Sequence, residues 1–556
     1  MSKLNHIFGI DLGTTYSCIS YVDEYMKPVV IKNSENERIT PSIVFFDDDE
    51  VIVGNVAKEN SQLSPDKVVS MIKRSMGDPN FIFEHQDNTY RPEEISSFIL
   101  RKLVKDAEQE LGFDIKDVVI TVPAYFGVNE REATANAGKI AGLNVRHIIN
   151  EPTAAAISYG LDKNDQDQVV LVYDLGGGTF DITMLEIKDK EIKVVCTGGN
   201  HKLGGKDWDS EIVKHLVNEI ERKTGESEES IFDDNETLND LYLQAETAKK
   251  SLTLRKKAAL AITHAGTKTK VKLSRKEFNA LTDHLLESTI DLTNEMLEEA
   301  KKKGYDTFDK ILLVGGSTRM PQIMDKLKSL YPVDIEFHDP DESVACGAAL
   351  FGHKISISDE VLSKMGDGVE EDTDSIDFDT VSQDIKEKAQ EEVAEEFGLM
   401  LDKVKKLTDT KVTNVTSKSF GIVTIDKADY KKFVTNLIMK NDPVPIETNK
   451  TFGTIEHNQD TVELIIMENL ISDPNERIEL EICTEIGNAV LTMPPGLPEN
   501  SPIEIYFKLT EDGRLVMKAV EQNEGRDVEV SVETEALMTG EQITEAQSRA
   551  NSIQVS

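Results

Sequence analysis

The sequence predicts an α/β domain of two related halves, then an acidic and helical linker, then an all-β domain. Short apolar runs alternate with long amphipathic segments up to about residue 355, which is typical of helices packed on sheets. Between Asp367 and Asp379 there are seven acidic residues and no basic one, a composition that cannot form a core. From about Val415 onward the apolar residues recur with a period of two, which indicates strands. We therefore expect domains at 1–355, 356–414 and 415–538, followed by a short helical or disordered tail at 539–556.

Strands of the first domain end in glycine or proline. Asp117–Val122 and Lys310–Val314 are examples, since each is apolar and directly precedes such a residue. A strand followed by a glycine-rich loop occurs three times, before Gly13, before Gly176 and at Gly315. This repetition predicts an internal duplication, with a ligand bound between the halves.

Two of these loops have the composition of a phosphate-binding site. Gly9–Thr15 and Asp174–Asp181 each follow an apolar run and combine glycines with threonine and aspartate. Glycine lets backbone N–H groups turn toward an anion, and aspartate oxygens suit a magnesium ion or its waters. One such loop could be an ordinary tight turn. Two of them favour a clamp on the phosphates of a nucleoside triphosphate.

Beyond the acidic stretch, one apolar stripe predicts a helix of about 27 residues. The stripe consists of Val381, Ile385, Ala389, Val393, Phe397, Leu401, Val404 and Leu407. It either packs on a neighbouring domain, which we favour, or docks a partner or a second copy of the chain.

The third domain is expected to be antiparallel. Ile503, Ile505, Phe507 and Leu509 alternate with polar residues, as do Val528, Val530 and Val532. Asp512-Gly513 lies between such runs and is a strong signal for a hairpin turn. The strands extend to about Thr534. From Thr539 onward the chain has little apolar surface and is expected to fray.

Composition excludes several classes of function. Asp and Glu outnumber Lys and Arg by 102 to 62, and no basic stripe interrupts the excess, so nucleic acid is not an expected partner. The four cysteines are scattered and predict neither a zinc site nor a disulfide framework. No apolar run approaches the roughly 20 residues of a membrane span, and the amino terminus lacks a signal peptide. We expect a cytoplasmic protein that does not bind membranes.

Residues 7–353 resemble the ATPase domain of the heat-shock 70 kDa chaperone family, within the actin-like superfamily. The words that carry the resemblance are Gly9-Ile10-Asp11-Leu12-Gly13-Thr14-Thr15-Tyr16-Ser17, Ile120-Thr121-Val122-Pro123-Ala124-Tyr125-Phe126, Asn150-Glu151-Pro152-Thr153-Ala154-Ala155-Ala156, Asp174–Asp181, Leu203-Gly204-Gly205 and Val314-Gly315-Gly316-Ser317-Thr318-Arg319. Residues 415–534 resemble the family's β-sandwich peptide-binding domain more weakly, through Ser419-Phe420-Gly421-Ile422, Leu437-Ile438-Met439-Lys440-Asn441 and the Asp512-Gly513 turn. The resemblance therefore implies a two-lobed actin-like ATPase domain and a β-sandwich.

The resemblance implies that residues of these motifs bind ATP and Mg²⁺. Backbone N–H groups would hold the β- and γ-phosphates, and they belong to Gly13, Thr14, Thr15, Tyr16, Gly176, Gly177 and Gly178. Asp11 and Asp174 would hold hydrated magnesium. Around the attacking water the resemblance places Lys73, Glu151, Thr179 and Asp181. Without the family, Lys73 and Arg74 would be interpreted as a solvated helix face.

Further matches concern the base, the contact between domains and the peptide. The adenosine pocket would be formed by Glu246, Lys249, Lys250, Thr253, Gly315, Gly316, Ser317, Arg319 and Asp341. Pro123 and Arg131 match residues that relay the nucleotide state, although Pro123 could equally be a strand-terminating turn. The peptide groove would be lined by Ile422, Ile425, Phe452, Val462 and Leu464. These five could also be core residues, and we favour Ile425 and Val462 for the groove.

The sequence departs from the family pattern in three places. About sixty residues stand where the family has a short apolar linker, and Thr408–Asn414 is polar apart from one valine, which puts coupling between the domains in doubt. The helical lid that follows the β domain is expected to be missing, and peptide is then expected to exchange quickly. His147 stands where the family commonly has an arginine that contacts J-domain partners, although Arg146 is adjacent.

These features predict an ATP-dependent chaperone that hydrolyses ATP slowly and binds exposed apolar segments of unfolded proteins. A J-domain co-chaperone and a nucleotide-exchange factor are its further expected partners. One alternative is a scaffolding protein that ATP switches and that recruits a dedicated partner without a refolding cycle. Another is a small-molecule kinase of the same superfamily, which would leave the β domain unexplained.

Overall fold

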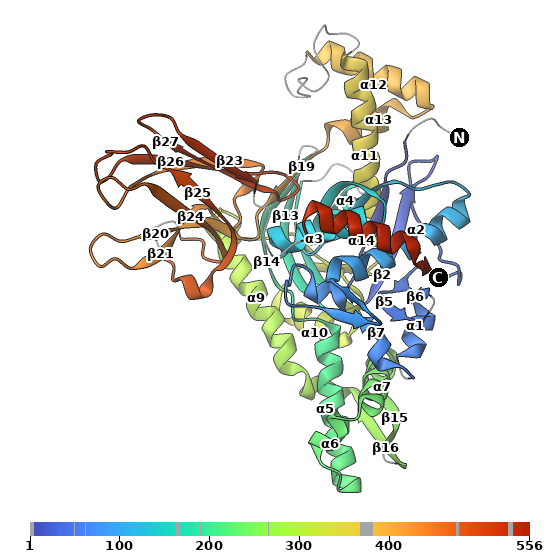
Figure 1. Ribbon diagram of the computed structural model, residues 1–556. Coiled ribbons are helices and arrows are strands. Elements are labelled where there is room, and N and C mark those ends of the chain that lie inside the picture. The colour runs from blue at the N-terminus through green and yellow to red at the C-terminus, as the bar shows by residue number, and fades with distance from the viewer. Residues whose placement is uncertain are drawn as a thin grey trace.

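The computed structural model describes residues 5–48, 50–61, 63–162, 167–188, 191–264, 266–366, 382–473, 477–531 and 538–556. The acidic stretch Asp367–Asp379, together with Val381, Val532 and the expected end of the β domain near Thr534, lies outside these residues. Figure 1 shows a large α/β body with the β domain at its left and a helical projection at its top.

The same five-strand pattern occurs twice in the α/β body. Its strand order is β11-β10-β1-β2-β3 in lobe I (residues 5–150) and β18-β17-β12-β13-β14 in lobe II (residues 167–342). In both, the first strand in the sequence pairs antiparallel with the second and parallel with the fourth. The strands are β1 (Phe8–Asp11), β2 (Tyr16–Val22), β3 (Pro28–Val30), β10 (Asp117–Val122) and β11 (Asn144–Asn150), then β12 (Gln168–Leu175), β13 (Phe180–Lys188), β14 (Glu191–Asn200), β17 (Lys310–Val314) and β18 (Asp334–Phe337). The predicted internal duplication is confirmed.

Two helices cross between the lobes, α4 (Glu151–Asp162) and α11 (Ser343–Gly366). They touch at Gly347, where an added Cβ would lie 1.7 Å from the carbonyl oxygen of Ala154. Alanines fill much of both contact faces, and one apolar cluster joins them to strands of both lobes. The lobes therefore share a core along this crossing.

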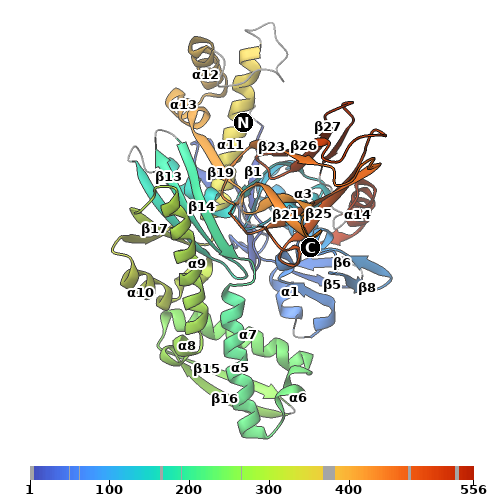
Figure 2. The ribbon, with the colours of Figure 1, turned by 90° about the vertical axis from the view of Figure 1, so that its left-hand side faces the viewer.

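The remaining elements surround the two sheets. Those of lobe I are β4 (Thr40–Pro41), β5 (Ile43–Phe46), β6 (Glu50–Val53), α1 (Asn55–Asn60), η1 (Pro65–Lys67), β7 (Val68–Ser70), η2 (Ile72–Ser75), β8 (Phe83–His85), β9 (Asn88–Tyr90), α2 (Pro92–Leu111) and α3 (Val128–Ile140). Those of lobe II are α5 (Gly205–Thr224), α6 (Glu228–Phe232), α7 (Asn235–Leu254), β15 (Lys257–His264), β16 (Thr267–Ser274), α8 (Arg275–Leu281), α9 (Asp283–Lys302), η3 (Gly316–Arg319) and α10 (Pro321–Leu330). In Figure 2, α5, α6 and α7 form the lower tip of lobe II.

The helical linker differs from the single long helix predicted from the sequence. It contains two helices, α12 (Gln383–Phe397) and α13 (Leu401–Asp409). The break falls at Gly398, whose φ of 68° ends α12 in the left-handed conformation that glycine tolerates. Both helices pack on the end of α11, which runs past residue 355, and Val393 and Val404 are buried there. From Ile385 to Leu407, the described part of the apolar stripe thus packs against the chain itself.

The segment between linker and β domain is a strand despite its polar sequence. β19 (Lys411–Val415) pairs in parallel with Glu191–Lys193 of β14, so it extends the sheet of lobe II. On its other side it pairs with β22 (Pro443–Val444) of the β domain. Backbone hydrogen bonds make these contacts, which explains why an apolar sequence is not required.

Two four-stranded antiparallel sheets form the β domain, in the orders β21-β20-β24-β25 and β23-β26-β27-β28. The strands are β20 (Ser419–Ile425), β21 (Lys432–Ile438), β23 (Ile446–Gly453), β24 (Thr461–Asn469), β25 (Thr484–Thr492), β26 (Pro502–Leu509), β27 (Leu515–Glu521) and β28 (Asp527–Ser531), with the short helix η5 (Leu480–Ile482). One core lies between the sheets, and the four alternating residues predicted from Ile503 to Leu509 are buried in it. The predicted turn joins β26 to β27, where Gly513 has a φ of 87°.

The last segment does not fray, in contrast to the prediction. It contains α14 (Gly540–Ser552) and β29 (Gln554–Val555), which lie against lobe I (Figure 1). Ala546, Ala550 and Val555 enter the core of that lobe, and β29 pairs with β6. These small apolar residues are too few to give an amphipathic signal in the sequence.

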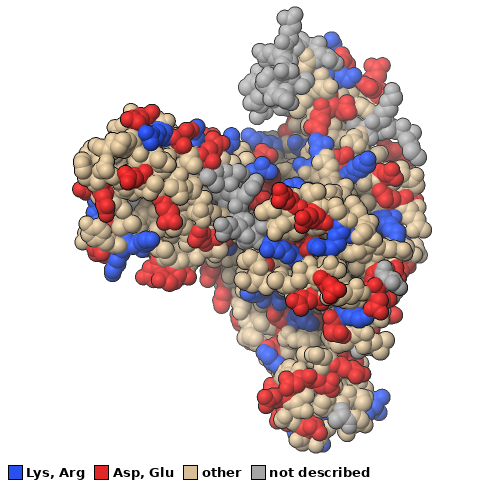
Figure 3. Space-filling model, in the orientation of Figure 1, with Lys and Arg blue, Asp and Glu red and all other residues tan. Residues whose placement is uncertain are grey.

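Charge is mixed on the face shown in Figure 3, where no unbroken basic stripe crosses the surface. Within the described part of the chain, no helix has both the length and the apolar character needed to cross a bilayer.

Candidate functional site

A cavity of about 870 Å³ opens between the lobes. Most of the residues predicted to bind nucleotide or metal line it: Asp11, Gly13, Thr14, Thr15, Tyr16, Lys73, Glu151, Asp174, Gly176, Gly177, Thr179, Glu246, Lys249, Lys250, Thr253, Gly315, Gly316, Ser317, Arg319 and Asp341. Of the other two, Gly178 lies against Thr14 of this lining, and Asp181 interacts electrostatically with Glu151 and Lys73. One cleft thus collects side chains that are up to 330 residues apart in sequence, from Asp11 to Asp341.

The two glycine loops face each other closely across this cleft. An added Cβ on Gly177 would lie 1.7 Å from Oγ1 of Thr15, and one on Gly178 would lie 2.4 Å from Cγ2 of Thr14. No larger residue fits at either glycine. The loops therefore form a cradle lined with backbone groups, which suits a chain of phosphates.

Acidic groups surround a single lysine at the base of the cavity. Lys73 and Glu151 form a buried ion pair. Burial lowers the pKa of Lys73, but Glu151 and Asp11 outweigh it and raise the pKa overall. Burial, reinforced by Glu151, raises the pKa of Asp11 and of Asp181 to about 7, and the pKa of Asp174 is also raised by burial. The site is short of positive charge.

A magnesium ion fits this deficit. Among the described residues, no three His, Cys, Asp or Glu side chains are grouped as a complete metal site. Mg²⁺ commonly uses one or two carboxylates and completes its shell with waters and substrate phosphates. Asp11 and Asp174 border the phosphate cradle and interact electrostatically with each other, so they match that requirement. Hydrogen bonds orient the neighbouring acids, since Thr121 donates to Asp11 at 3.1 Å and the Tyr125 backbone donates to Asp181 at 3.1 Å.

The end of the cavity that is predicted to bind adenosine contains two sets of ion pairs. Glu246 binds Lys58 at 2.6 Å and Lys250 at 2.8 Å. Burial alone would raise the pKa of Glu246, but the two lysines lower it to about 2. Arg319 pairs with Asp341 at 2.6 Å while half exposed, which leaves its guanidinium face accessible to a base.

Sequence reasoning missed several residues of this cavity. Lys58 belongs to no sequence motif, and only its ion pair with Glu246 shows that it is part of the cavity. Lys206, Asp209 and Tyr242 also line the cavity, and Lys206 directly follows the Leu203-Gly204-Gly205 motif. Arg74 is not a solvated cation, because it donates to the carbonyl oxygen of Gly178 at 2.9 Å and pairs with Asp207 at 2.6 Å.

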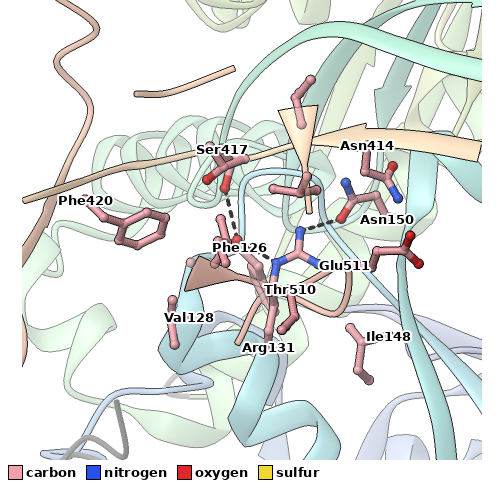
Figure 4. Close-up of a pocket in the computed structure, with 16 residues that line it drawn as sticks. Phe126, Val128, Arg131, Ile148, Asn150, Asn414, Ser417, Phe420, Thr510 and Glu511 are labelled. Carbon is pink, nitrogen blue, oxygen red and sulfur yellow. Dashed lines mark hydrogen bonds between the residues drawn. The ribbon is translucent and has the colours of Figure 1, made fainter. Parts of the chain in front are cut away.

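Arg131, one of the two proposed relay residues, lies at the contact between lobe I and the β domain (Figure 4). Arg131 donates to the carbonyl oxygen of Phe126 at 3.1 Å and to the side chain of Asn150. Burial lowers the pKa of Arg131 to about 10, although neighbouring acids including Asp512 oppose this. Pro123 directly follows β10, and its carbonyl oxygen accepts a hydrogen bond from the backbone N–H of Phe126 at 3.1 Å.

The five groove candidates fall into two groups. Ile422 and Leu464 are only 2% and 3% exposed, so in this arrangement they belong to the core of the sandwich and offer no surface to a peptide. Ile425, Phe452 and Val462 are partly exposed. Phe452 and Val462 pack on the same core from its rim.

His147 supplies no positive charge to a partner. It is partly buried against Phe351, with ring centroids 5.0 Å apart, and burial lowers its pKa to about 4. The adjacent Arg146 is held by Asp359 at 2.7 Å.

Comparison with known proteins agrees with this geometry. The profile of the family described as "Hsp70 protein" matches residues 7–81, 79–364 and 397–556. The chain belongs to the Hsp70 family. The "Chaperone protein DnaK" of each of two Halobacterium salinarum strains is 36% identical to it over 555 residues, which is 98% of this chain and 77% of the relative.

Membership in the Hsp70 family accounts for the two-lobed α/β body and the β domain that follows it. Hsp70 proteins are ATP-dependent chaperones, so this chain is an ATP-hydrolysing chaperone of that type, with an actin-like ATPase domain and a β-sandwich. The segment that the family profile leaves unmatched, between residues 364 and 397, includes the acidic stretch and most of α12.

Proposed function

We propose that hydrolysis of ATP between the lobes of this Hsp70 protein controls how tightly its β domain holds extended apolar segments of unfolded proteins. The observation that carries the proposal is the buried pair of Lys73 and Glu151 at the base of the glycine cradle, next to Asp11, Asp174 and Asp181. Phosphoryl transfer to water requires mainly positioning and stabilisation of charge. This cluster offers both.

Each group has a separate role in this proposal. Backbone N–H groups of Gly13–Tyr16 and Gly176–Gly178 hold the terminal phosphates. Asp11 and Asp174 hold magnesium, which neutralises phosphate charge when bound. Lys73 places its ammonium group toward the terminal phosphate, and Glu151 fixes the lysine. Thr179 and Asp181 orient the attacking water.

Adenosine recognition uses the opposite end of the cavity. Glu246, Lys249, Lys250 and Thr253 lie on one face of α7 and bind the ribose and the base edge, and Gly315–Ser317 approach with their backbone. The guanidinium group of Arg319, oriented by Asp341, stacks on the base.

The β domain receives the nucleotide signal through Pro123, Arg131 and β19. The support for this route is contact: β19 belongs to the sheet of lobe II and pairs with β22, while Arg131 lies at the interface with lobe I. Extended apolar segments bind along the β domain by side-chain pockets and backbone hydrogen bonds. Ile425, Phe452 and Val462 offer accessible surface, and Ile422 and Leu464 join them after the sheets rearrange.

Further partners follow from the family. We propose a cytoplasmic protein that works with a J-domain co-chaperone and a nucleotide-exchange factor. The neutral His147 indicates that the J-domain contact of this chain is weaker than usual.

Steady-state ATP hydrolysis with and without an extended apolar peptide tests the proposal. We expect the peptide to raise the rate of ATP turnover of the full chain. The turnover of the Arg131→Ala variant should not respond to the peptide. If the ATP turnover of the full chain is the same with and without peptide, the proposal is contradicted and a nucleotide-switched scaffold is favoured.

A further inference from the structure

Lys206 occupies an unusual place in the wall of the nucleotide cavity. It is the second residue of α5, and its backbone N–H donates at 2.8 Å to the carbonyl oxygen of Gly177 in the phosphate cradle. Its side chain borders the cavity, with Nζ 3.2 Å from the ring centroid of Tyr242. Lys206 is therefore fixed in the cavity wall, by its backbone bond to the cradle and by the contact of its amine with Tyr242.

No carboxylate in the described part of the chain forms an ion pair with this amine. The two nearest in sequence are already engaged, because Asp207 pairs with Arg74 at 2.6 Å and Asp209 with Lys249 at 2.8 Å. An ammonium group also lies unfavourably in the first turn of a helix, where the helix dipole is positive. The helix position thus disfavours the charged form, whereas the face of the Tyr242 ring favours it.

Burial lowers the pKa of Lys206 to about 8, and the neighbouring Lys249 and Arg74 act in the same direction against Asp209 and Glu246. At pH 7.5 such a group is roughly one quarter neutral, whereas a lysine with the ordinary pKa of 10.5 is about 0.1% neutral. Only the neutral amine has a free electron pair. Lys206 can therefore act as a nucleophile near neutral pH.

We propose that Lys206 is a site of acylation by small acyl phosphates, and that bound nucleotide blocks the reaction. The ligand class follows from the cavity, since the glycine cradle would hold the phosphate group and leave the attached carbonyl next to Nζ. The amine attacks the carbonyl carbon, an N–C amide bond forms and the C–O bond to phosphate breaks. Inorganic phosphate leaves, and the nitrogen loses its proton to water.

Acylation changes the cavity in a defined way. It removes one positive charge and the contact of that charge with the Tyr242 ring. It also adds an acyl group to the wall that ATP must pass. We infer that the modification weakens nucleotide binding. Because bound nucleotide blocks the reaction, acylated Lys206 marks molecules whose cavity was empty. The inference depends on the phosphate-binding role proposed for the glycine loops.

The experiment incubates the full chain with acetyl phosphate at pH 7.5 and measures acetylation of each lysine by mass spectrometry over time. Lys202 is the matched control, because it is exposed and lies four residues upstream. We expect Lys206 to react at least about tenfold faster than Lys202, a margin set below the gain in free amine because amines of lower pKa are weaker nucleophiles. Saturating ATP with magnesium should reduce the Lys206 rate to that of Lys202 and leave Lys202 unchanged. A Lys206→Arg variant should lose only this modification.

Two further arms separate the possible failures. Inorganic phosphate should slow the reaction of Lys206 with acetyl phosphate but not with an N-hydroxysuccinimide ester of acetate, which has no phosphate group. Equal rates at Lys206 and Lys202, or fast reaction with the ester but not with acetyl phosphate, would overturn the inference. Calorimetry of ATP binding to the same sample tests the nucleotide site independently. If ATP does not bind, the proposed nucleotide site is wrong, and this result is distinguishable from a failure of acylation alone.

Discussion

The hydroxyl group of Ser417 donates a hydrogen bond of 3.0 Å to the backbone carbonyl oxygen of Phe126. The same oxygen accepts from Arg131, at 3.1 Å (Figure 4). One carbonyl group of lobe I thus binds both the start of the β domain and the arginine that we propose as a relay. A change in the loop after β10 reaches both partners directly.

Replacing Ser417 with alanine should weaken docking of the β domain by about 1 kcal/mol, since one buried hydrogen bond between the domains is lost. The expected result is a smaller rise in ATP turnover on addition of peptide, with unchanged turnover in its absence. Thr461→Ala, at an exposed position of β24, is the control. An unaltered peptide response in Ser417→Ala would show that this contact does not transmit the signal.

Lys73→Ala should abolish most of the hydrolysis and preserve ATP binding. Positioned groups of this kind contribute about 100-fold or more to rate, whereas the phosphates retain the glycine cradle. Single-turnover hydrolysis and calorimetric ATP binding measure the two separately. Lys67→Ala, a partly exposed lysine of lobe I, should behave as the parent. If Lys73→Ala hydrolyses ATP at the parent rate, the assignment of Lys73 is wrong.

Ala550→Asp should destabilise lobe I. Ala550 is 3% exposed in the core of that lobe, and an unpaired charge there should cost about 3 kcal/mol. Hydrogen exchange of β6 should accelerate, because β29 protects that strand. Ser548→Asp places the same charge on the exposed face of α14 and should leave the exchange unchanged. Identical exchange in the two variants would contradict the docking of α14.

Docking of the β domain should weaken between pH 5 and pH 7.5 because of Glu468. This carboxyl group is buried against the start of α3, and burial raises its pKa from 4.5 to about 7 although Lys418 opposes the change. The docked state therefore binds the proton more tightly than the undocked state. The contribution of Glu468 is neutral below pH 4.5 and becomes unfavourable as the pH rises to 7, by at most about 3 kcal/mol at 1.36 kcal/mol per pKa unit.

Fluorescence energy transfer between labels on the α/β and β domains measures this dependence. Glu468→Gln should bind as tightly at pH 7.5 as the parent does at pH 5. If Glu468→Gln keeps the pH dependence of the parent, that dependence arises from another titrating group.

Binding of magnesium and ATP should release protons at pH 7. The pKa values of Asp11 and Asp181 are about 7 without metal, and a bound cation favours their charged forms. The binding enthalpy should therefore vary with the ionisation enthalpy of the buffer at pH 7, and this variation should shrink above pH 8. Buffer-independent enthalpy at pH 7 would show that these acids are already ionised.

Motifs with fixed local geometry could be predicted from the sequence. The glycine loops, the ends of β10 and β17 and the Gly513 turn depend on neighbours in the chain, so their residues specify them directly. The internal duplication was also predictable, because each half repeats a strand and its loop.

Features that depend on distant contacts could not be predicted. The polar β19 forms because β14 offers it an open edge, and Lys58 belongs to the site only because α7 brings Glu246 to it. The break at Gly398 was visible as a glycine, but an unbroken apolar spacing on either side favoured one helix. In the last segment, two alanines of α14 and the valine of β29 enter a core that lobe I otherwise supplies.

The contact between Gly347 and Ala154 has a mechanical consequence. The backbones of α11 and α4 meet there with no side chain between them, so the two helices cannot separate or slide without losing the core they share. We therefore expect the mouth of the cleft to widen by rotation about this contact rather than by separation of the two helices.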